Sequence, residues 1–169
     1  MTDGDAAGTS QGPGEPAFSH LDSAGRARMV DVTGKATTAR RATARCVVRS
    51  SPAALEAAAK DDDFVPFARA AGIHAAKQAS SLIPLCHPLP VDDVDVRVEL
   101  DLAAGTASVH VSTSVVARTG IEIEALTACG FTGLALMSSL LDYDPTTVVT
   151  ELALWHKSGG RSGTWERSA

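Results

Sequence analysis

The chain has 169 residues, of which 44% are hydrophobic and 21% charged, which fits one domain that can bury its own core without disulfides or metals. The net charge is −5 at pH 7, the sequence pI is about 5.4 and the Lys and Arg residues are scattered, so no nucleic-acid partner is expected. The three cysteines show no CxxC spacing, which indicates neither a disulfide framework nor a zinc site and fits a cytoplasmic location.

The N-terminal segment, residues 1–17, is rich in Gly and Pro and low in large hydrophobic residues. Such a composition buries too little apolar surface to offset the conformational entropy lost on ordering, so we expect a disordered tail. A domain is expected at residues 18–163, followed by a short C-terminal tail at residues 164–169. The segment lacks the basic and apolar regions of a signal peptide, so export is not indicated. No uninterrupted apolar run approaches the roughly 20 residues that span a bilayer, which predicts a soluble protein.

A strand and two helical pieces are expected before Pro84. Small and β-branched residues accumulate over residues 36–50, which predicts the first strand. Pro52 opens an Ala-rich helix over residues 53–60, and apolar residues recur at helical spacing over residues 64–80.

A hairpin and a long helix follow. Apolar and polar residues alternate over residues 94–102 and again over residues 106–117, which predicts two antiparallel strands joined at Ala104-Gly105. Residues 121–142 are too apolar for a surface helix and need the sheet and another subunit to cover them. A last strand over residues 146–156 completes a β-α-β-β-α-β order, typical of an α+β ferredoxin-like subunit with an antiparallel sheet packed on helices.

The segment from Leu82 to Leu89 sets a thiol and an imidazole, Cys86 and His87, side by side between two prolines. Prolines fix the local backbone, and such rigidity can hold reactive side chains in place. Spacing alone favours the plainer interpretation, a buried loop in which Cys86 packs as a small hydrophobe and His87 caps a backbone carbonyl.

Two further segments could carry chemistry. The segment Thr119–Ala125 places Glu122 and Glu124 at a helix start, where the positive end of the dipole stabilises anions, although any well-charged first turn has this pattern. The segment Lys157–Gly163 combines flexible backbone amides with two cations, which suits phosphate but equally suits a mobile C-terminal tail. The histidines are not clustered, so no metal site is expected.

Together these segments resemble one family in order and spacing, the cyclic pyranopterin monophosphate synthases, or molybdenum cofactor biosynthesis protein C. The resemblance covers about residues 18–163, and five linked segments are far more specific than any one of them. They are Met29–Lys35, Ala71–Lys77, Leu82–Leu89, Thr119–Leu126 and Lys157–Gly163.

The resemblance implies a ferredoxin-like subunit in a homohexamer, a trimer of dimers, with active sites at the dimer interfaces. It also implies a lyase reaction without a cofactor, in which 3′,8-cyclo-7,8-dihydro-GTP is rearranged to cyclic pyranopterin monophosphate with loss of pyrophosphate. Lys35 and Lys157 would offset triphosphate charge and act with His87 as catalytic residues. The implied substrate-binding residues are Leu85, Cys86, His87, Glu122, Ile123 and Glu124.

The sequence departs from the family pattern in its catalytic centre. Ser138 stands where the family's catalytic Asp is expected, and Leu141 stands where its Lys is expected. Neither side chain replaces the lost charge, and losing a positioned acid or base costs about 10²–10⁴ in rate for each group. Asp142, one helical turn after Ser138, could rescue the acid. A loop that is basic in the family is acidic here at residues 59–63.

These departures leave two interpretations open. The first is a cyclic pyranopterin monophosphate synthase with rearranged acid–base chemistry. The alternative is a catalytically impaired or repurposed paralogue that binds a nucleotide or pterin, acts on another cyclised nucleotide, or assembles with an active family member.

Overall fold

The computed structural model describes residues 20–22 and 24–168, and the predicted tail at residues 1–17 lies outside them. The chain divides into two compact units, one ending at Val30 and one beginning at Asp31. Within the first unit, Leu21 and Ala27 form an antiparallel bridge. Asp22 closes the turn between them, because its carboxylate accepts the backbone N–H groups of Ala24 and Arg26.

The second unit is built on one five-stranded sheet in the order β2-β3-β1-β4-β5, with every neighbouring pair antiparallel. The order of the first four strands, with helices after β1 and β3, confirms the predicted α+β ferredoxin-like fold. A short strand also forms within residues 164–169 and pairs with β4. The strands are β1 (Thr38–Arg49), β2 (Asp93–Asp101), β3 (Thr106–Ala117), β4 (Val148–Ser158) and β5 (Trp165–Glu166).

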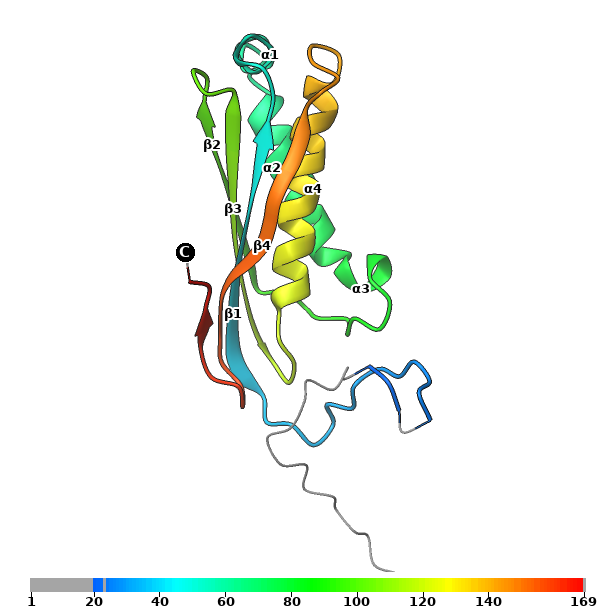
Figure 1. The fold of residues 1–169 in the computed structure, drawn as a ribbon. Helices are drawn as coiled ribbons and strands as arrows, with labels where there is room; N and C mark the ends of the chain where they lie inside the picture. The colour runs from blue at the N-terminus through cyan, green and yellow to red at the C-terminus, as the bar shows by residue number, and fades with distance from the viewer. Residues whose placement is uncertain (1–19, 23, 169) are drawn as a thin grey trace, which may run out of the picture. The chain divides into compact units, whose positions relative to one another are not determined.

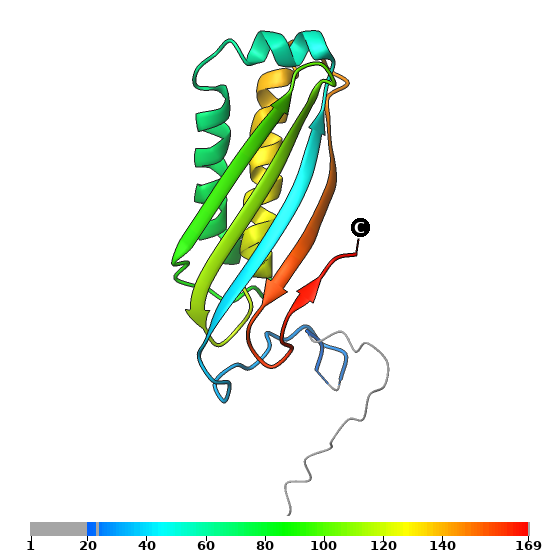
Figure 2. The ribbon, with the colours of Figure 1, turned by 90° about the vertical axis from the view of Figure 1, so that its left-hand side faces the viewer.

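The long helices α2 and α4 lie side by side on one face of this sheet (Figure 1). The other face of the sheet carries no helix of the described second unit (Figure 2). The segment before Pro84 contains three helices where two pieces were expected, since the chain breaks after Lys77 and resumes for one turn. The helices are α1 (Pro52–Ala58), α2 (Phe64–Lys77), α3 (Ala79–Leu82) and α4 (Glu122–Leu140).

The core lies between the sheet and the two long helices. Alternation on β3 buries one face of the strand as predicted, including Val109 and Val111, while the residues between them stay partly exposed. Helix α4 is long and apolar enough to cross a membrane by composition, but half of it is buried against the sheet and α2, as in the core helix of a globular domain.

The turn after α4 is tied to the end of β1 by one carboxylate. Asp144 Oδ2 accepts the backbone N–H of Ser51 at 2.8 Å and the hydroxyl of Ser50 at 3.3 Å. Its other oxygen accepts the backbone N–H and the hydroxyl of Thr146. These hydrogen bonds lower the pKa of Asp144 to about 2, the Thr146 hydroxyl making the largest contribution. The C-terminal end of α4 is thereby fixed to the start of α1.

Candidate active site

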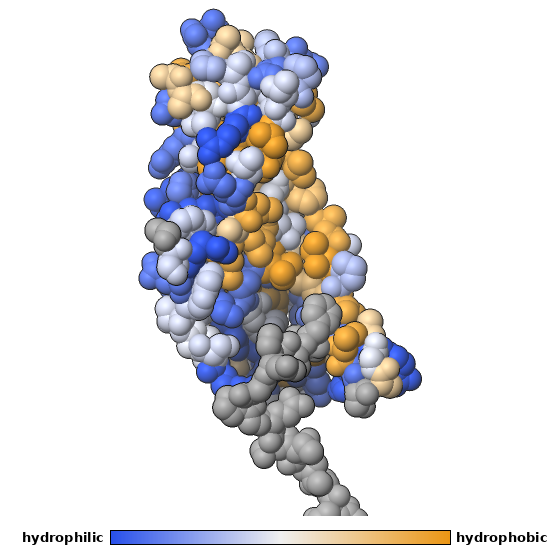
Figure 3. Space-filling model, viewed as in Figure 1, coloured by the Kyte–Doolittle hydropathy of each residue, from blue (hydrophilic) through white to orange (hydrophobic). Residues whose placement is uncertain are grey.

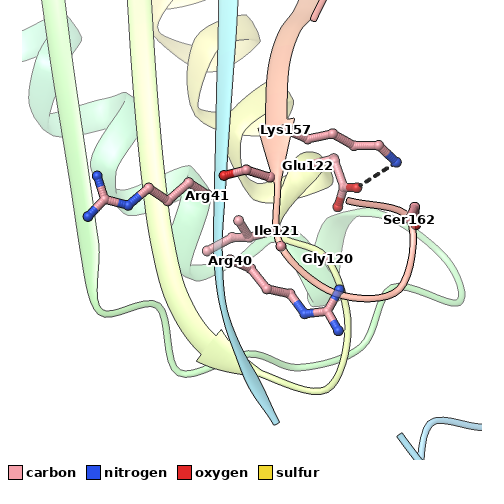
Figure 4. Close-up of a pocket in the computed structure, with 9 residues that line it drawn as sticks. Arg40, Arg41, Gly120, Ile121, Glu122, Lys157 and Ser162 are labelled. Carbon is pink, nitrogen blue, oxygen red and sulfur yellow. Dashed lines mark ion pairs between the residues drawn. The ribbon is translucent and has the colours of Figure 1, made fainter. Parts of the chain in front are cut away.

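The N-terminal end of α4 meets the C-terminal end of β4, and a salt bridge joins them. Lys157 Nζ on β4 lies 3.2 Å from Oε1 of Glu122, the first residue of α4 (Figure 4). Both side chains keep about a third of their surface exposed, 33% and 28%. The pair is therefore held by the fold but open to a ligand, which could compete for the lysine.

A polar recess surrounds this pair and encloses about 240 Å³, open solvent included. Arg40 on β1 borders it, with its guanidinium donating to the carbonyl oxygens of Ala117 and Arg118 at 3.2 and 3.1 Å. Arg41, the next residue, extends to the other side of the sheet (Figure 4). The full lining is Arg40, Arg41, Gly120, Ile121, Glu122, Lys157, Ser158, Gly159 and Ser162.

Two glycines let the chain after β4 turn tightly against β1. Gly159 and Gly160 have φ of +96° and +71°, in the left-handed region that favours glycine. A Cβ on Gly159 would collide with the carbonyl of Ala39, and one on Gly160 would collide with the guanidinium of Arg40. The glycines thus bring the Lys157 segment and Arg40 to the same recess.

Glu124 lies on α4 two residues after Glu122, and its side chain is buried. Only 2% of its surface is exposed, and Cys86 Sγ lies 3.6 Å from its Oε1. Burial is the main cause that raises the pKa of Glu124, and the negative charge of Glu122 adds to it. Desolvation therefore outweighs the stabilisation that a helix N-terminus offers to a carboxylate.

The loop that carries Cys86 is locally strained. Leu85 has φ of +64°, an uncommon conformation for a residue with a branched side chain. The thiol of Cys86 is partly buried, and burial, followed by the nearby charge of Glu124, raises its pKa to about 11. Cys86 is consequently a neutral thiol at physiological pH.

Comparison with known proteins decides the family. A family model described as the MoaC family matches residues 29–160. The chain belongs to the MoaC family.

Curated relatives of this MoaC-family chain align over most of its length. It is 42% identical over 153 residues to the cyclic pyranopterin monophosphate synthase of Parvibaculum lavamentivorans, covering 88% of this chain and 96% of the relative. It is 44% identical over 150 residues to the same-named protein of Roseiflexus sp., covering 86% and 95%. Cyclic pyranopterin monophosphate synthase 3 of Mycobacterium tuberculosis is 44% identical over 154 residues, covering 89% and 86%.

The structure brings together only part of the residue set predicted from the sequence. Glu122 meets Lys157, and Cys86 meets Glu124, at the same end of α4. His87 is partly buried beside Cys86. Two other predicted residues lie near the same end of α4. Leu85 is partly buried, and Ile123 is 39% exposed.

Lys35 and the C-terminal residues of α4 lie elsewhere. Lys35 is exposed in a turn before β1, where its backbone N–H bonds to the carbonyl of Val32, and it does not line the recess. Ser138, Leu141 and Asp142 are exposed at the opposite end of α4. At 1.5 Å per residue, the 14 residues from Glu124 to Ser138 correspond to about 21 Å along the helix axis.

Two recess residues, Arg40 and Arg41, were not among the site residues predicted from the sequence, and Arg40 is the one whose side chain borders the salt bridge. It lies 117 positions before Lys157 in the chain, and only the antiparallel pairing of β1 with β4 makes the two neighbours. A usable signal was the adjacent pair of arginines in a strand, since one of two successive side chains must face the helix side of the sheet.

The site of this MoaC-family chain combines two cations with two carboxyl groups in different environments. Arg40 and Lys157 suit phosphate, with Arg as a planar donor and Lys as a point charge. Glu122 is partly exposed and ion-paired, whereas Glu124 is buried with a raised pKa, so the two carboxyls are suited to different protonation states. In the part of the chain that the structure describes, no three His, Cys, Asp or Glu side chains gather to hold a metal ion.

Proposed function

We propose that the protein is a lyase of molybdenum cofactor biosynthesis that converts 3′,8-cyclo-7,8-dihydro-GTP to cyclic pyranopterin monophosphate and releases pyrophosphate. The observation that carries the proposal is the meeting of Arg40 and Lys157 with Glu122 in the recess at the start of α4, with the buried Glu124 two residues further along the helix. A triphosphate needs cations, and a ring rearrangement needs groups that move protons. The names of the curated relatives support the same reaction.

The side chains divide the work by charge. Lys157 exchanges its contact with Glu122 for substrate phosphate, and Arg40 adds a second cation at the recess. Release of Lys157 frees Glu122 to accept a proton, while the buried Glu124 faces the base portion of the substrate with His87 and Cys86. Lys35 lies outside the recess of its own subunit, so its proposed role requires the segment before β1 to bring it to the substrate.

The assembly is proposed to be a homohexamer, a trimer of dimers, in which neighbouring subunits complete each active site. Even with open solvent included, the recess encloses only about 240 Å³, which is less than the roughly 300–1,000 Å³ of typical small-molecule sites. Apolar side chains also gather on the side where α4 and β4 lie (Figure 3). Phe131, Leu134 and Leu152 are 40–52% exposed there, a surface of the kind that subunit contacts cover.

In such a hexamer, the C-terminal end of α4 would contribute residues to the active site of a neighbouring subunit. Ser138 and Leu141 lie too far from Glu124 to share its site within one subunit, so they would face the active site of a neighbour. We propose that these two positions mark a diverged active site and that Asp142, exposed beside them, supplies the missing acid. The enzyme is assigned to the cytoplasm.

The alternative, an impaired or repurposed paralogue, rests on Ser138 and Leu141. The relatives at 42–44% identity are all named as synthases, which favours the enzyme over the alternative. An impaired or repurposed paralogue is therefore one of the outcomes that the pyrophosphate-release assay below would reveal.

Pyrophosphate release from the cyclised GTP substrate tests the proposal. The purified protein is compared with a family member that keeps the Asp and Lys, at equal subunit concentration. Turnover within about a hundredfold of that reference supports the lyase, because loss of both groups without rescue would cost more than that. Measurable substrate binding without pyrophosphate release would sink the proposal and leave the binding paralogue.

The role of Asp142 has its own test. Asp142→Asn should lower kcat by at least about tenfold, as expected for removal of a general acid or base. Asp101→Asn, at the exposed end of β2, is the matched control and should leave the rate unchanged.

A further inference from the structure

The contact between Cys86 and Glu124 leaves one buried oxygen without a partner. Cys86 Sγ lies 3.6 Å from Glu124 Oε1 and 3.7 Å from the carbonyl oxygen of His87, both within reach of a thiol donor. The other oxygen, Glu124 Oε2, is buried, and no donor among the described residues forms a hydrogen bond with it. The residue as a whole is only 2% exposed. Buried acceptors without a donor are rare and costly, so Oε2 calls for a donor that the described residues do not supply.

We infer that Cys86 is a positioning residue whose thiol donates to Glu124 Oε1 and fixes the carboxyl so that Oε2 faces an N–H or O–H donor of the substrate. The inference rests on the proposed function, since it takes the ligand to be the cyclised nucleotide. It assigns the thiol a structural task in catalysis and excludes covalent attack on the substrate.

The protonation of the thiol agrees with this role. A nucleophilic cysteine needs a lowered pKa and a cationic neighbour, whereas the neighbour of Cys86 is a carboxyl group and the pKa is raised to about 11. A protonated thiol can donate a hydrogen bond, and this bond acts with the larger effect of the Glu124 backbone N–H to lower the pKa of Glu124 against the opposing effects of burial and Glu122. The thiol therefore helps the buried carboxyl to ionise.

The backbone holds the thiol in place. Leu85, immediately before Cys86, has the left-handed φ of +64°, a conformation that persists only where the surroundings impose it. The prolines at positions 84 and 88 restrict the same loop, and the Cys86 N–H bonds to the carbonyl of Ile83 at 3.3 Å. The backbone that carries the thiol is therefore restricted on both sides of Cys86.

The first experiment needs no substrate. Alkylation of Cys86 by iodoacetamide at pH 8 is followed peptide by peptide in the wild type and in Glu124→Gln. Removing the carboxylate charge lowers the pKa of Cys86, so the variant should react at least about threefold faster through its larger thiolate fraction. Glu122→Gln, a matched change without a thiol contact, should alter the rate less. Equal rates in the wild type and Glu124→Gln would overturn the inference.

The second experiment separates positioning from nucleophilic attack. Cys86→Ala should lower kcat/KM for the cyclised GTP substrate roughly tenfold, as expected for loss of a hydrogen bond to a charged group. Cys86→Ser keeps a donor and should stay within about threefold of the wild type. Cys129→Ala removes a core thiol and controls for thiol loss, and thermal unfolding checks that each variant is folded.

The outcomes separate this inference from the proposed function. A nucleophile would leave Cys86→Ser as inactive as Cys86→Ala, and a bystander would leave Cys86→Ala fully active, and either result refutes positioning. If the wild type itself fails to turn over the cyclised substrate, the proposed function fails, while the alkylation rates still decide whether the thiol senses Glu124.

Discussion

Gly72→Ala should destabilise the fold because α2 and α4 touch at this glycine. A Cβ there would lie 2.9 Å from the carbonyl oxygen of Ala128 and would overlap the hydroxyl of Thr132. That hydroxyl cannot simply turn away, since it is fully buried and donates to the same Ala128 carbonyl at 2.8 Å. The methyl group must therefore push the helices apart or break this hydrogen bond.

The expected cost follows from three contributions. Overpacking costs about 1–3 kcal/mol and the lost hydrogen bond about 1 kcal/mol, while replacing Gly by Ala inside a helix returns about 1 kcal/mol. The net loss in the free energy of unfolding is about 1–3 kcal/mol. For a chain of this size, each kcal/mol lost lowers Tm by roughly 2–4 °C.

Urea unfolding at fixed protein concentration measures this loss, with Gly34→Ala as the control because a Cβ at Gly34 meets nothing within 4 Å. Adding Thr132→Ala to Gly72→Ala removes the overlapping atoms, so the double variant should lose less stability than the sum of the single variants. Wild-type stability in Gly72→Ala, or strict additivity in the double variant, would refute the steric explanation.

Three further predictions concern the site and its supports. Lys157→Met should lower kcat/KM by about 10²-fold or more through lost phosphate binding, whereas Arg161→Met, an exposed cation in the same segment, should have a much smaller effect; steady-state kinetics decide. Gly160→Ala should raise KM, because a Cβ there displaces Arg40 and the φ of +71° disfavours alanine; an unchanged KM would argue against Arg40 as a substrate contact. The pKa of Asp144 is lowered from 3.8 to about 2, so its stabilising effect is complete above pH 4 and is lost as the pH falls toward 2. When the free energy of unfolding is measured across this pH range, Asp144→Asn should lose less stability than the wild type.

Much of the fold could be predicted from local pattern. The alternation in β2 and β3 depends only on neighbouring residues, and the structure places both strands within one residue of their predicted ends. The long apolar helix was likewise expected at residues 121–142 and is observed at Glu122–Leu140. Helix α3 escaped prediction because a single turn has too few residues to show a period.

The site was harder to predict, because its chemistry depends on burial and on pairing across the sheet. The sequence places Glu122 and Glu124 in the same first turn, but only the packed structure shows that one is ion-paired and the other is buried against Cys86. Helical periodicity places Glu122 and Glu124 on different faces, with Glu124 in line with the buried Ala128 and Thr132, but it does not reveal their partners Lys157 and Cys86. Arg40 depends on strand register, which no local pattern specifies.

The short strand β5 has a consequence for the lysine of the recess. Lys157 lies opposite Ala42 of β1 on one side and Trp165 of β5 on the other, so its backbone is held inside the sheet with a strand on each side. When an anion binds, this lysine surrenders only the rotational freedom of its side chain, because the main chain was already immobilised on folding. Strand β5 thus helps to preorganise a cation for its ligand and reduces the entropic penalty of binding.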